Sequence, residues 1–255
     1  MSFLRGDGVP VLMYHWVNHD IGDRLRLYGV RPGAFESQVR RLRAAGYRAV
    51  SLGDLRSHLR RKTTLPARSV VLTFDDGYLD NIEHAAPVLE AAGWSATVFV
   101  VTERLGGVNE WDLHAGDPPR RLMTWEDARR LDGTVFRFEP HTRTHPFLDR
   151  VDRTRAQDEI LGSKKRLEDE LGREAEAFSY PHGAYDDEAE AVVRDAGFLA
   201  AVTDVWGLNR AGDDPLRIRR TMITSRDVLP TFAFKVVTGY GAYNLADKLL
   251  GRGPR

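Results

Sequence analysis

The sequence has no cysteine among its 255 residues. That absence excludes disulfide bonds, thiolate ligands to a metal and cysteine nucleophiles. The chain also lacks an excess of charge of either sign, because its 37 Lys and Arg residues balance its 37 Asp and Glu residues. Since domains that bind nucleic acids are usually strongly basic, we expect no nucleic-acid partner.

Long hydrophobic runs are missing as well. The longest, residues 96–101, has the length of a strand and falls far short of the ~18 apolar residues of a membrane-spanning helix. The early apolar run, residues 9–14, is too short for the core of a signal peptide and contains a proline. We therefore expect no transmembrane segment and a cytoplasmic protein, or an extracellular one if a leader was removed from the chain.

What the sequence does contain is an alternation of short apolar runs with helical patterns, which is typical of βα units. Hydrophobic residues make up 42% of the chain, enough for a folded core. The expected strands are residues 9–14, 47–52, 69–74, 96–101, 135–138, 177–180 and 199–202. The expected helices are residues 33–45, 55–61, 82–92, 125–131, 153–171 and 187–196. This alternation favours one closed or nearly closed parallel barrel over residues 1–255; the alternative is an open doubly wound sheet, because periodicity does not reveal closure.

The C-terminal residues 229–255 carry a further amphipathic pattern. Leu229, Phe232, Val236 and Tyr240 recur at spacings near four, as on one face of a helix. We expect a C-terminal extension that packs on the barrel. The alternative is a weak peripheral contact with a membrane surface.

The strongest local feature is Asp75-Asp76-Gly77, directly after the apolar run 69–74. Catalytic residues of parallel barrels lie at the carboxyl ends of the strands. Two neighbouring carboxylates do not both stay ionised cheaply unless a cation lies between them or one takes a proton. The pair therefore points to one metal ligand and one general base, provided that Gly77 turns the chain so that both reach one site. Taken alone, the tripeptide is also good turn chemistry.

A second feature is the pair His141 and His145, spaced so that both rings can reach one ion. Pro146 follows at once, so we expect the pair on a loop. Two histidines and an aspartate make a three-ligand set that leaves positions for water and substrate, as in catalytic zinc sites. The same set also fits non-haem iron, which is the alternative chemistry.

Two weaker features also follow expected strands. His182 lies in a Pro-His-Gly turn that could aim a backbone N–H at a developing oxyanion. His15 follows the run 9–14 and could serve as a general acid. Taken alone, each histidine also fits a purely structural role.

Together these segments resemble the polysaccharide deacetylases, which contain the NodB-homology domain and form carbohydrate esterase family 4. The resemblance rests on Thr-Phe-Asp-Asp-Gly at 73–77, His-Thr-x-Thr-His at 141–145 and Tyr-Pro-x-Gly at 180–183. Val-Leu-Met-Tyr-His at 11–15 is similar to the branch with the poly-N-acetylglucosamine deacetylases, where the motif order is circularly permuted and the catalytic histidine comes first. The resemblance implies a single distorted (β/α)7 barrel.

By this resemblance, Asp76, His141 and His145 hold a divalent metal, most often zinc, with cobalt, nickel or iron(II) as alternatives. The implied activity is metal-dependent removal of N-acetyl groups from an N-acetylated sugar or polysaccharide. The implied partner is therefore a carbohydrate substrate.

The resemblance also assigns Asp75 as the general base, His15 as the acid that protonates the leaving amine, and the His182 amide as an oxyanion donor. The arginine that opens the third motif in much of the family is absent here, so we look for a partner of Asp75 in the run 216–220. Glu139 replaces a small residue beside the first metal histidine, where it could crowd the substrate, bond to that histidine or face solvent.

The same site would suit other substrates. An O-acetyl esterase, or a deacetylase of a small metabolite or glycolipid, would use the same residues. A non-catalytic carbohydrate-binding protein is a third hypothesis, and the intact Asp75, Asp76, His141 and His145 argue against it. The sequence leaves the sugar and the oligomeric state open.

Overall fold

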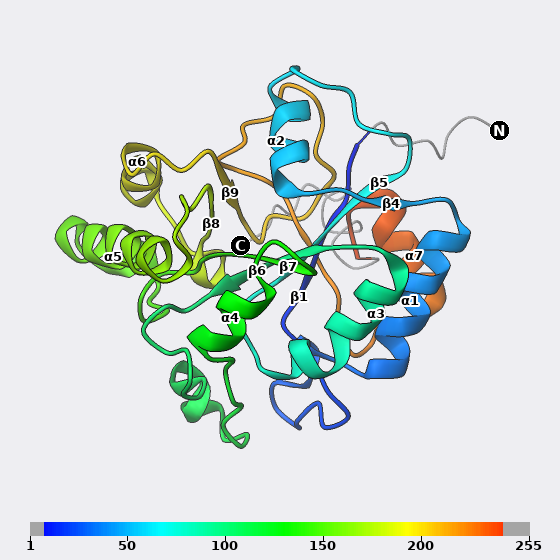
Figure 1. Cartoon of the computed structure of the whole chain (residues 1–255), viewed down its shortest axis with the longest axis horizontal. Coiled ribbons are helices and arrows are strands. Elements are labelled where there is room, and N and C mark those ends of the chain that lie inside the picture. The colour runs from blue at the N-terminus through cyan, green and yellow to red at the C-terminus, as the bar shows by residue number, and fades with distance from the viewer. Residues whose placement is uncertain (1–7, 242–255) are drawn as a thin grey trace, which may run out of the picture.

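Parallel strands form the centre of the fold, and helices surround them (Figure 1). The computed structural model describes residues 8–241. Its strands are β1 Val11–Tyr14, β2 Trp16–Val17, β3 Gly29–Val30, β4 Arg48–Ala49, β5 Ser69–Phe74, β6 Ala96–Val100, β7 Phe136–Pro140, β8 Ala177–Ser179, β9 Ala200–Val202 and β10 Thr221–Met222. Its α-helices are α1 Pro32–Ala44, α2 Leu52–Leu59, α3 Ala86–Ala92, α4 Trp125–Leu131, α5 Arg153–Leu171, α6 Asp187–Asp195 and α7 Leu229–Thr238.

The main sheet has the order β10-β1-β5-β6-β7, with β4 added beside β5, and every pairing in it is parallel. A second parallel pair, β8 and β9, continues the ring, and Val202 of β9 bridges Ile218, just before β10. This arrangement confirms the predicted α/β barrel of parallel strands and helices. Between β7 and β8, which are neighbours, the described residues form no strand ladder.

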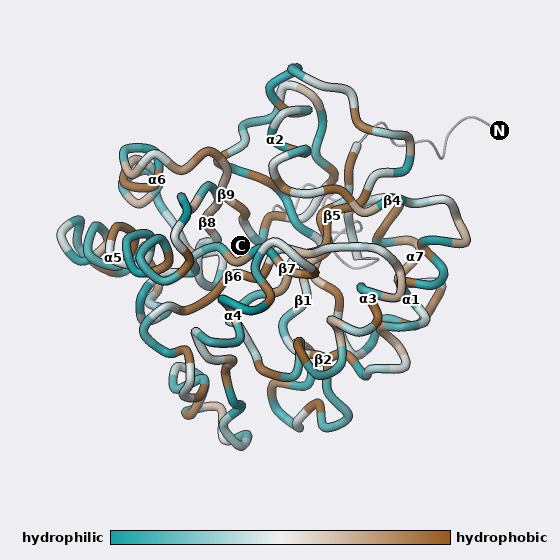
Figure 2. The backbone as a smooth tube through the Cα atoms, viewed as in Figure 1, coloured by the Kyte–Doolittle hydropathy of each residue, from teal (hydrophilic) through white to brown (hydrophobic). Residues whose placement is uncertain are grey.

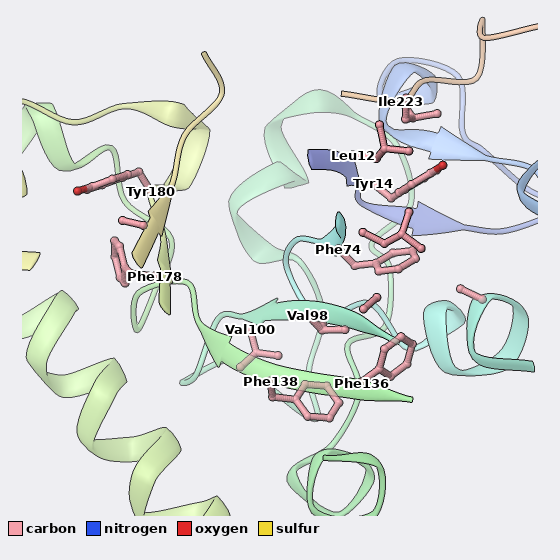
Figure 3. Close-up of a cluster of buried hydrophobic side chains, with 14 of the residues drawn as sticks. Leu12, Tyr14, Phe74, Val98, Val100, Phe136, Phe138, Phe178, Tyr180 and Ile223 are labelled. Atoms are coloured by element: carbon pink, nitrogen blue, oxygen red, sulfur yellow. The ribbon is translucent and has the colours of Figure 1, made fainter. Parts of the chain in front are cut away.

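The outer sides of the strands carry most of the hydrophobic core, which helices α1 and α3 to α6 cover. Figure 3 shows side chains of β1, β5, β6 and β7 gathered in this core, with Phe178 and Tyr180 at its far side. The residues along the strands are mostly hydrophobic, whereas many residues of the outer helices are hydrophilic (Figure 2). Burial of such one-sided apolar faces is what holds helices on a sheet.

A smaller cluster fills the barrel interior at the amino ends of the strands. It combines Val11, Val71 and Phe99 with Leu52 and Leu55 of α2. Helix α2 therefore closes this end of the barrel. Polar residues lie at the opposite end of the barrel, where the strands reach their carboxyl ends.

Two predicted elements differ from the structure for local reasons. The strand expected at residues 47–52 is limited to β4, because the Ser51 side chain accepts a hydrogen bond from the Asp54 amide and starts α2 early. The helix expected at residues 82–92 begins as α3 with Pro87 in its first turn, where proline is tolerated, after a wider turn at Asn81–Ala85.

Helix α7 begins the expected C-terminal extension, of which the structure describes residues 229–241. Its residues Phe232 and Val236 are buried in the main core, so its apolar face packs on the barrel. Residues 242–255 lie outside the described part of the chain. Within residues 8–241, no helix combines the length and the apolar character needed to cross a membrane.

Candidate metal-dependent active site

Two loops that follow parallel strands meet at the carboxyl end of the barrel. Asp75 and Asp76 follow β5, while His141 and His145 follow β7. One ligand atom each from Asp76, His141 and His145 lies within 4.8 Å of the others, and all three side chains are buried. We call these three residues the ligand cluster. The structure thus brings together the residues predicted to hold a metal.

The backbone at this site is strained. Among residues 8–241, six non-glycine residues have a positive φ, and four of them belong to the site loops: Asp76, Thr142, His145 and His182. Such conformations cost roughly 1–3 kcal/mol each and are retained mainly at functional sites. These strained conformations set the directions of the side chains in the site.

Gly77 extends the left-handed turn that begins at Asp76. Its φ is 81°, and a Cβ there would lie 3.1 Å from Val100 and 3.2 Å from Leu105. Glycine is therefore the residue that fits the turn after β5. This turn lets adjacent carboxylates serve one site, as the sequence predicts.

The distances between ligand atoms in the ligand cluster fit an ion with tetrahedral coordination. The Oδ1 atom of Asp76 lies 3.6 Å from Nε2 of His141 and 3.2 Å from Nε2 of His145. Two ligand atoms at ~2.1 Å from one zinc ion would lie about 3.4 Å apart. Moreover, this buried Oδ1 has no hydrogen-bond partner among residues 8–241, which a bound cation would supply.

Protonation in the ligand cluster also suits a metal. Burial lowers the pKa of His145 to about 4 and that of His141 well below its usual value, so both rings are neutral at pH 7. The Nδ1 of His141 lies 2.7 Å from the Ser179 carbonyl oxygen, which can only accept. The ring proton therefore sits on Nδ1, and the Nε2 lone pair faces Asp76.

Asp75 and Asp76 differ in their electrostatic surroundings. Burial alone would raise the pKa of Asp75, but the Arg220 guanidinium outweighs it and holds this pKa at about 2. Burial raises the pKa of Asp76 to about 7, with the charge of Asp75 adding to the effect. Asp75 is therefore ionised at neutral pH, whereas Asp76 needs a nearby cation to be fully ionised there.

Arg220 is the partner of Asp75 that sequence reasoning looked for in the run 216–220. Its guanidinium makes two bonds to the Asp75 carboxylate, of 2.6 and 2.7 Å. It also donates to the Ser179 hydroxyl at 3.2 Å and to Asp204 at 3.0 Å, and it is fully buried. A buried guanidinium with this many acceptors fixes Asp75 in one orientation.

His15 lies between β1 and β2, at the same end of the barrel. Its ring meets the Tyr28 ring edge-on, with centroids 4.8 Å apart. Its buried Nδ1 has no hydrogen-bond partner within the described chain. A positive charge on this ring would lower the pKa of both Asp75 and Asp76, so the ring lies close enough to act on both carboxylates. Its role as an acid stays a prediction.

His182 also reaches the ligand cluster. Its ring meets the His145 ring edge-on at 4.4 Å and stacks on Phe147 at 3.8 Å. Its backbone is left-handed, with φ 58°. The predicted oxyanion role of its amide is not tested by these contacts.

Trp111 and Asp112 belong to the site, although sequence reasoning gave them no role. The Trp111 ring packs on the His145 ring, with centroids 4.5 Å apart. Burial raises the pKa of Asp112, and the nearby charge of Asp76 raises it further. The Asp112 carboxylate accepts a hydrogen bond from the side-chain amide of Asn109. Trp111 and Asp112 both lie in the 3₁₀ turn Glu110–Ala115, and only the fold brings that turn against the ligand cluster.

Glu159 of α5 is a second residue that sequence reasoning missed. Its fully buried carboxylate accepts from the backbone amides of Arg143 and Thr144, both at 2.8 Å, and from the Thr144 hydroxyl at 2.6 Å. It therefore anchors the loop that carries both histidines. A signal was available, because Glu159 falls on the apolar stripe of α5 beside Ala156 and Ile160.

Glu139 does none of the three things expected of it. Its carboxylate is buried and contacts neither His141 nor solvent; it accepts from the backbone amides of Glu176 and Ala177. Arg137 and Arg173 lie beside it, at 3.2 and 3.4 Å. Strand alternation turns this side chain toward the base of the barrel rather than toward the ligand cluster.

Comparison with known families supports the geometry. Residues 62–201, more than half of the chain, match the family model described as polysaccharide deacetylase. The matched range includes the ligand cluster and Asp75, whereas His15 and Arg220 lie outside it.

Individual relatives agree with this match. The putative polysaccharide deacetylase YxkH of Bacillus subtilis is 28% identical over 195 residues, which cover 76% of this chain and 64% of that protein. The poly-beta-1,6-N-acetyl-D-glucosamine N-deacetylase of Escherichia coli K12 is 37% identical over 128 residues, or 49% of this chain and 19% of that enzyme. The structure of IcaB from Ammonifex degensii has a TM-score of 0.78 at 25% identity, covering 91% of this chain and 97% of that one. The chain thus spans less than two thirds of these two curated relatives.

Proposed function

Because the chain belongs to the polysaccharide deacetylase family, we propose that it is a metal-dependent hydrolase that removes N-acetyl groups from an N-acetylated sugar or polysaccharide. The observation that carries this proposal is the ligand cluster, set beside a carboxylate that Arg220 keeps ionised. A metal site next to a fixed base is one arrangement that catalyses the hydrolysis of an unactivated amide.

The proposed metal is zinc, with cobalt, nickel or iron(II) as alternatives. Asp76, His141 and His145 would hold it, since one carboxylate and two neutral imidazoles form a common zinc set that leaves room for water and substrate. When bound there, the ion supplies Lewis acidity that activates water and polarises the acetyl carbonyl.

The protein groups then divide the proton transfers. The water oxygen bonds to the acetyl carbon while the Asp75 carboxylate takes a proton from that water. The C–N bond breaks as His15 gives a proton to the departing nitrogen, so the products are acetate and a free amine. The His182 amide is proposed to donate to the oxyanion. Each proton transfer of this kind contributes roughly 10²–10⁴-fold in rate.

The proposed substrate class follows from the relatives. The E. coli relative is named for poly-beta-1,6-N-acetyl-D-glucosamine, although this chain spans only 19% of it. An oligomer or polymer of an N-acetylated hexosamine is therefore the first substrate to test. O-acetylated glycans and small N-acetylated metabolites or glycolipids are the alternatives.

The test compares three substrates at one enzyme concentration: N-acetylglucosamine oligomers, an O-acetylated glycan and N-acetylglucosamine itself. We expect acetate and free amine in equal amounts from the oligomers. His145→Ala should abolish the reaction, whereas His58→Ala, on α2 at the far end of the barrel, should retain it. Acetate without amine would favour the esterase. No acetate from any substrate with zinc-loaded protein would favour the carbohydrate-binding alternative.

A further inference from the structure

Strands β7 and β8 are joined by side chains instead of by a backbone ladder. The other neighbouring strands around the ring form ladders, except β9 and β10, where Val202 of β9 instead bridges Ile218 just before β10. Between Phe136–Pro140 and Ala177–Ser179, the described residues share no backbone–backbone hydrogen bond. We call this boundary the seam. Something other than the ladder must set the distance across it.

Glu139 supplies two of the bonds across the seam. It lies on β7, and its Oε2 atom accepts from the amide of Glu176 at 2.9 Å and from the amide of Ala177 at 3.1 Å. The carboxylate takes the place of the backbone carbonyls that a neighbouring strand would offer. Because one donor is the residue just before β8 and the other is the first residue of β8, Glu139 fixes where that strand begins.

Two arginines contact the other oxygen of the Glu139 carboxylate. Arg137 contacts its Oε1 at 3.2 Å and Arg173 contacts the same atom at 3.4 Å. Arg173 also bonds to the Phe138 carbonyl and makes two bonds to Asp132, so it is held in place itself. This leaves Oε2 free to accept from the amides of Glu176 and Ala177.

The far end of β8 bears directly on the ligand cluster. The Ser179 carbonyl, two residues after Ala177, accepts from Nδ1 of His141. The Ser179 hydroxyl accepts from Arg220, which holds Asp75. A displacement of β8 would therefore move the group that orients His141 and a group that orients Arg220.

The base of the seam leaves room for such a displacement. A cavity of about 280 Å³ lies there, and its walls include Arg137, Glu139, Glu176 and Ala177. Without the carboxylate, the two amides would face this cavity and β8 would have no fixed distance from β7. Groups behind a ligand that fix its orientation typically contribute 10- to 100-fold to metal affinity.

From these contacts we infer that Glu139 is a positioning residue for the metal site: it sets the β7–β8 distance and thereby the orientation of His141. The inference rests on the proposed function only in assigning a metal to His141. It concerns a residue that lies outside the ligand cluster and faces the opposite end of the barrel.

The test measures zinc affinity by competition with a chromogenic chelator, so it does not depend on finding the substrate. Glu139→Gln keeps the size of the side chain but leaves a single oxygen, for which the charged guanidiniums of Arg137 and Arg173 compete with the two amides. Glu139→Asp keeps the charge but withdraws it from β8. We expect zinc affinity to fall at least 10-fold in both. Glu176→Gln is the matched control, because that half-exposed side chain lines the same cavity and, within residues 8–241, forms a single ion pair, with Arg56 at 3.6 Å. Its affinity should equal that of the wild type.

Two spectroscopic readouts separate positioning from general destabilisation. In the wild type, the Ala177 amide should be strongly protected from hydrogen exchange, and ¹⁵N shifts should place the His141 proton on Nδ1. Glu139→Gln should lose both signatures while its circular dichroism stays native. Wild-type zinc affinity in folded Glu139 variants, an equal loss in Glu176→Gln, or an unprotected Ala177 amide in the wild type would each overturn the inference.

Discussion

Asp75 and Asp76 are neighbours in the chain, yet their surroundings give them opposite properties. Asp75 makes two bonds to a buried guanidinium and has a pKa of about 2. Asp76 faces two neutral imidazoles, and burial raises its pKa to about 7. A single turn of the chain therefore supplies both a base, Asp75, and a metal ligand, Asp76.

The Asp75–Arg220 pair should make the protein sensitive to acid. An aspartate has a pKa of ~3.9 in the unfolded chain, so a folded value of about 2 stabilises the native state above pH 4. This contribution, roughly 2–3 kcal/mol, is lost as the pH falls from about 4 to about 2. The difference in free energy of unfolding between wild type and Asp75→Asn, measured in urea, should therefore be about half gone at pH 3. A difference that stays constant from pH 6 to pH 3 would contradict the assigned pKa.

His15 should matter in proportion to how much the leaving group needs a proton. His15→Ala should keep the bound metal but lose about 10²-fold or more in kcat on an N-acetyl sugar. On an activated acetyl ester, whose leaving group departs unprotonated, the loss should be small. Equal losses on the two substrates would return His15 to a structural role.

The residues of the site were predictable to different degrees. Asp75, Asp76, His141 and His145 stand in short motifs whose chemistry is visible in the chain. Arg220 was narrowed only to a run of five positions, because it reaches Asp75 across 145 residues of sequence. Local spacing carries no information about a contact of that range.

At the scale of single elements, α5 acts on the site through one inward-facing charge. Glu159 is fully buried and binds two amides and a hydroxyl of the loop after β7. The side chain is thus part of the support for His145, which closes the same loop.

Glu159→Gln should therefore loosen the histidine loop. We expect a loss of about 2–3 kcal/mol in the free energy of unfolding, because amide donors lose a charged acceptor, together with weaker zinc binding. Asp169→Asn, on the exposed side of α5, should change the free energy of unfolding by less than about 1 kcal/mol. Urea unfolding and zinc titration measure the two effects. If Glu159→Gln were as stable as Asp169→Asn, the histidine loop would not depend on Glu159 for its conformation.

Elements were predicted best where one signal dominates. The helix expected at 153–171 is confirmed as α5, because its apolar stripe is long and regular. The strand expected at 47–52 was wrong in length, because the Ser51 cap outweighs the apolar run. Strand β10 was not expected at all, since two residues, Thr221 and Met222, are too few for a pattern.

At the scale of the whole molecule, the parallel barrel gathers residues that lie far apart in the chain. His15, Asp75, His141 and His182 follow β1, β5, β7 and β8, whose carboxyl ends share one side of the fold. The alternation of apolar runs predicted seven strands, which correspond to β1 and β4 to β9, but it did not predict the short strands β2, β3 and β10. The seam between β7 and β8 was not predictable, because strand pairing is a property of neighbours in space.

A metal that joins β5 to β7 should stabilise the entire fold. With free zinc at 100 times the dissociation constant, binding contributes about 2.7 kcal/mol. For a chain of this size that corresponds to a rise in Tm of roughly 5–10 °C. Differential scanning calorimetry should show this rise in the wild type, its reversal by a chelator, and its absence in His145→Ala. The same rise in His145→Ala would place the zinc elsewhere.

The central claim is that the ligand cluster holds one catalytic metal ion beside Asp75, and a zinc titration of metal-free protein tests it most directly. Acetate release from N-acetylglucosamine oligomers is followed while zinc is added. We predict that the rate rises linearly and reaches a plateau at one zinc per chain. In Asp75→Asn, zinc should bind with the same stoichiometry and the rate should stay near the background. Full activity before any zinc is added, in protein shown to be free of metal, would contradict the account.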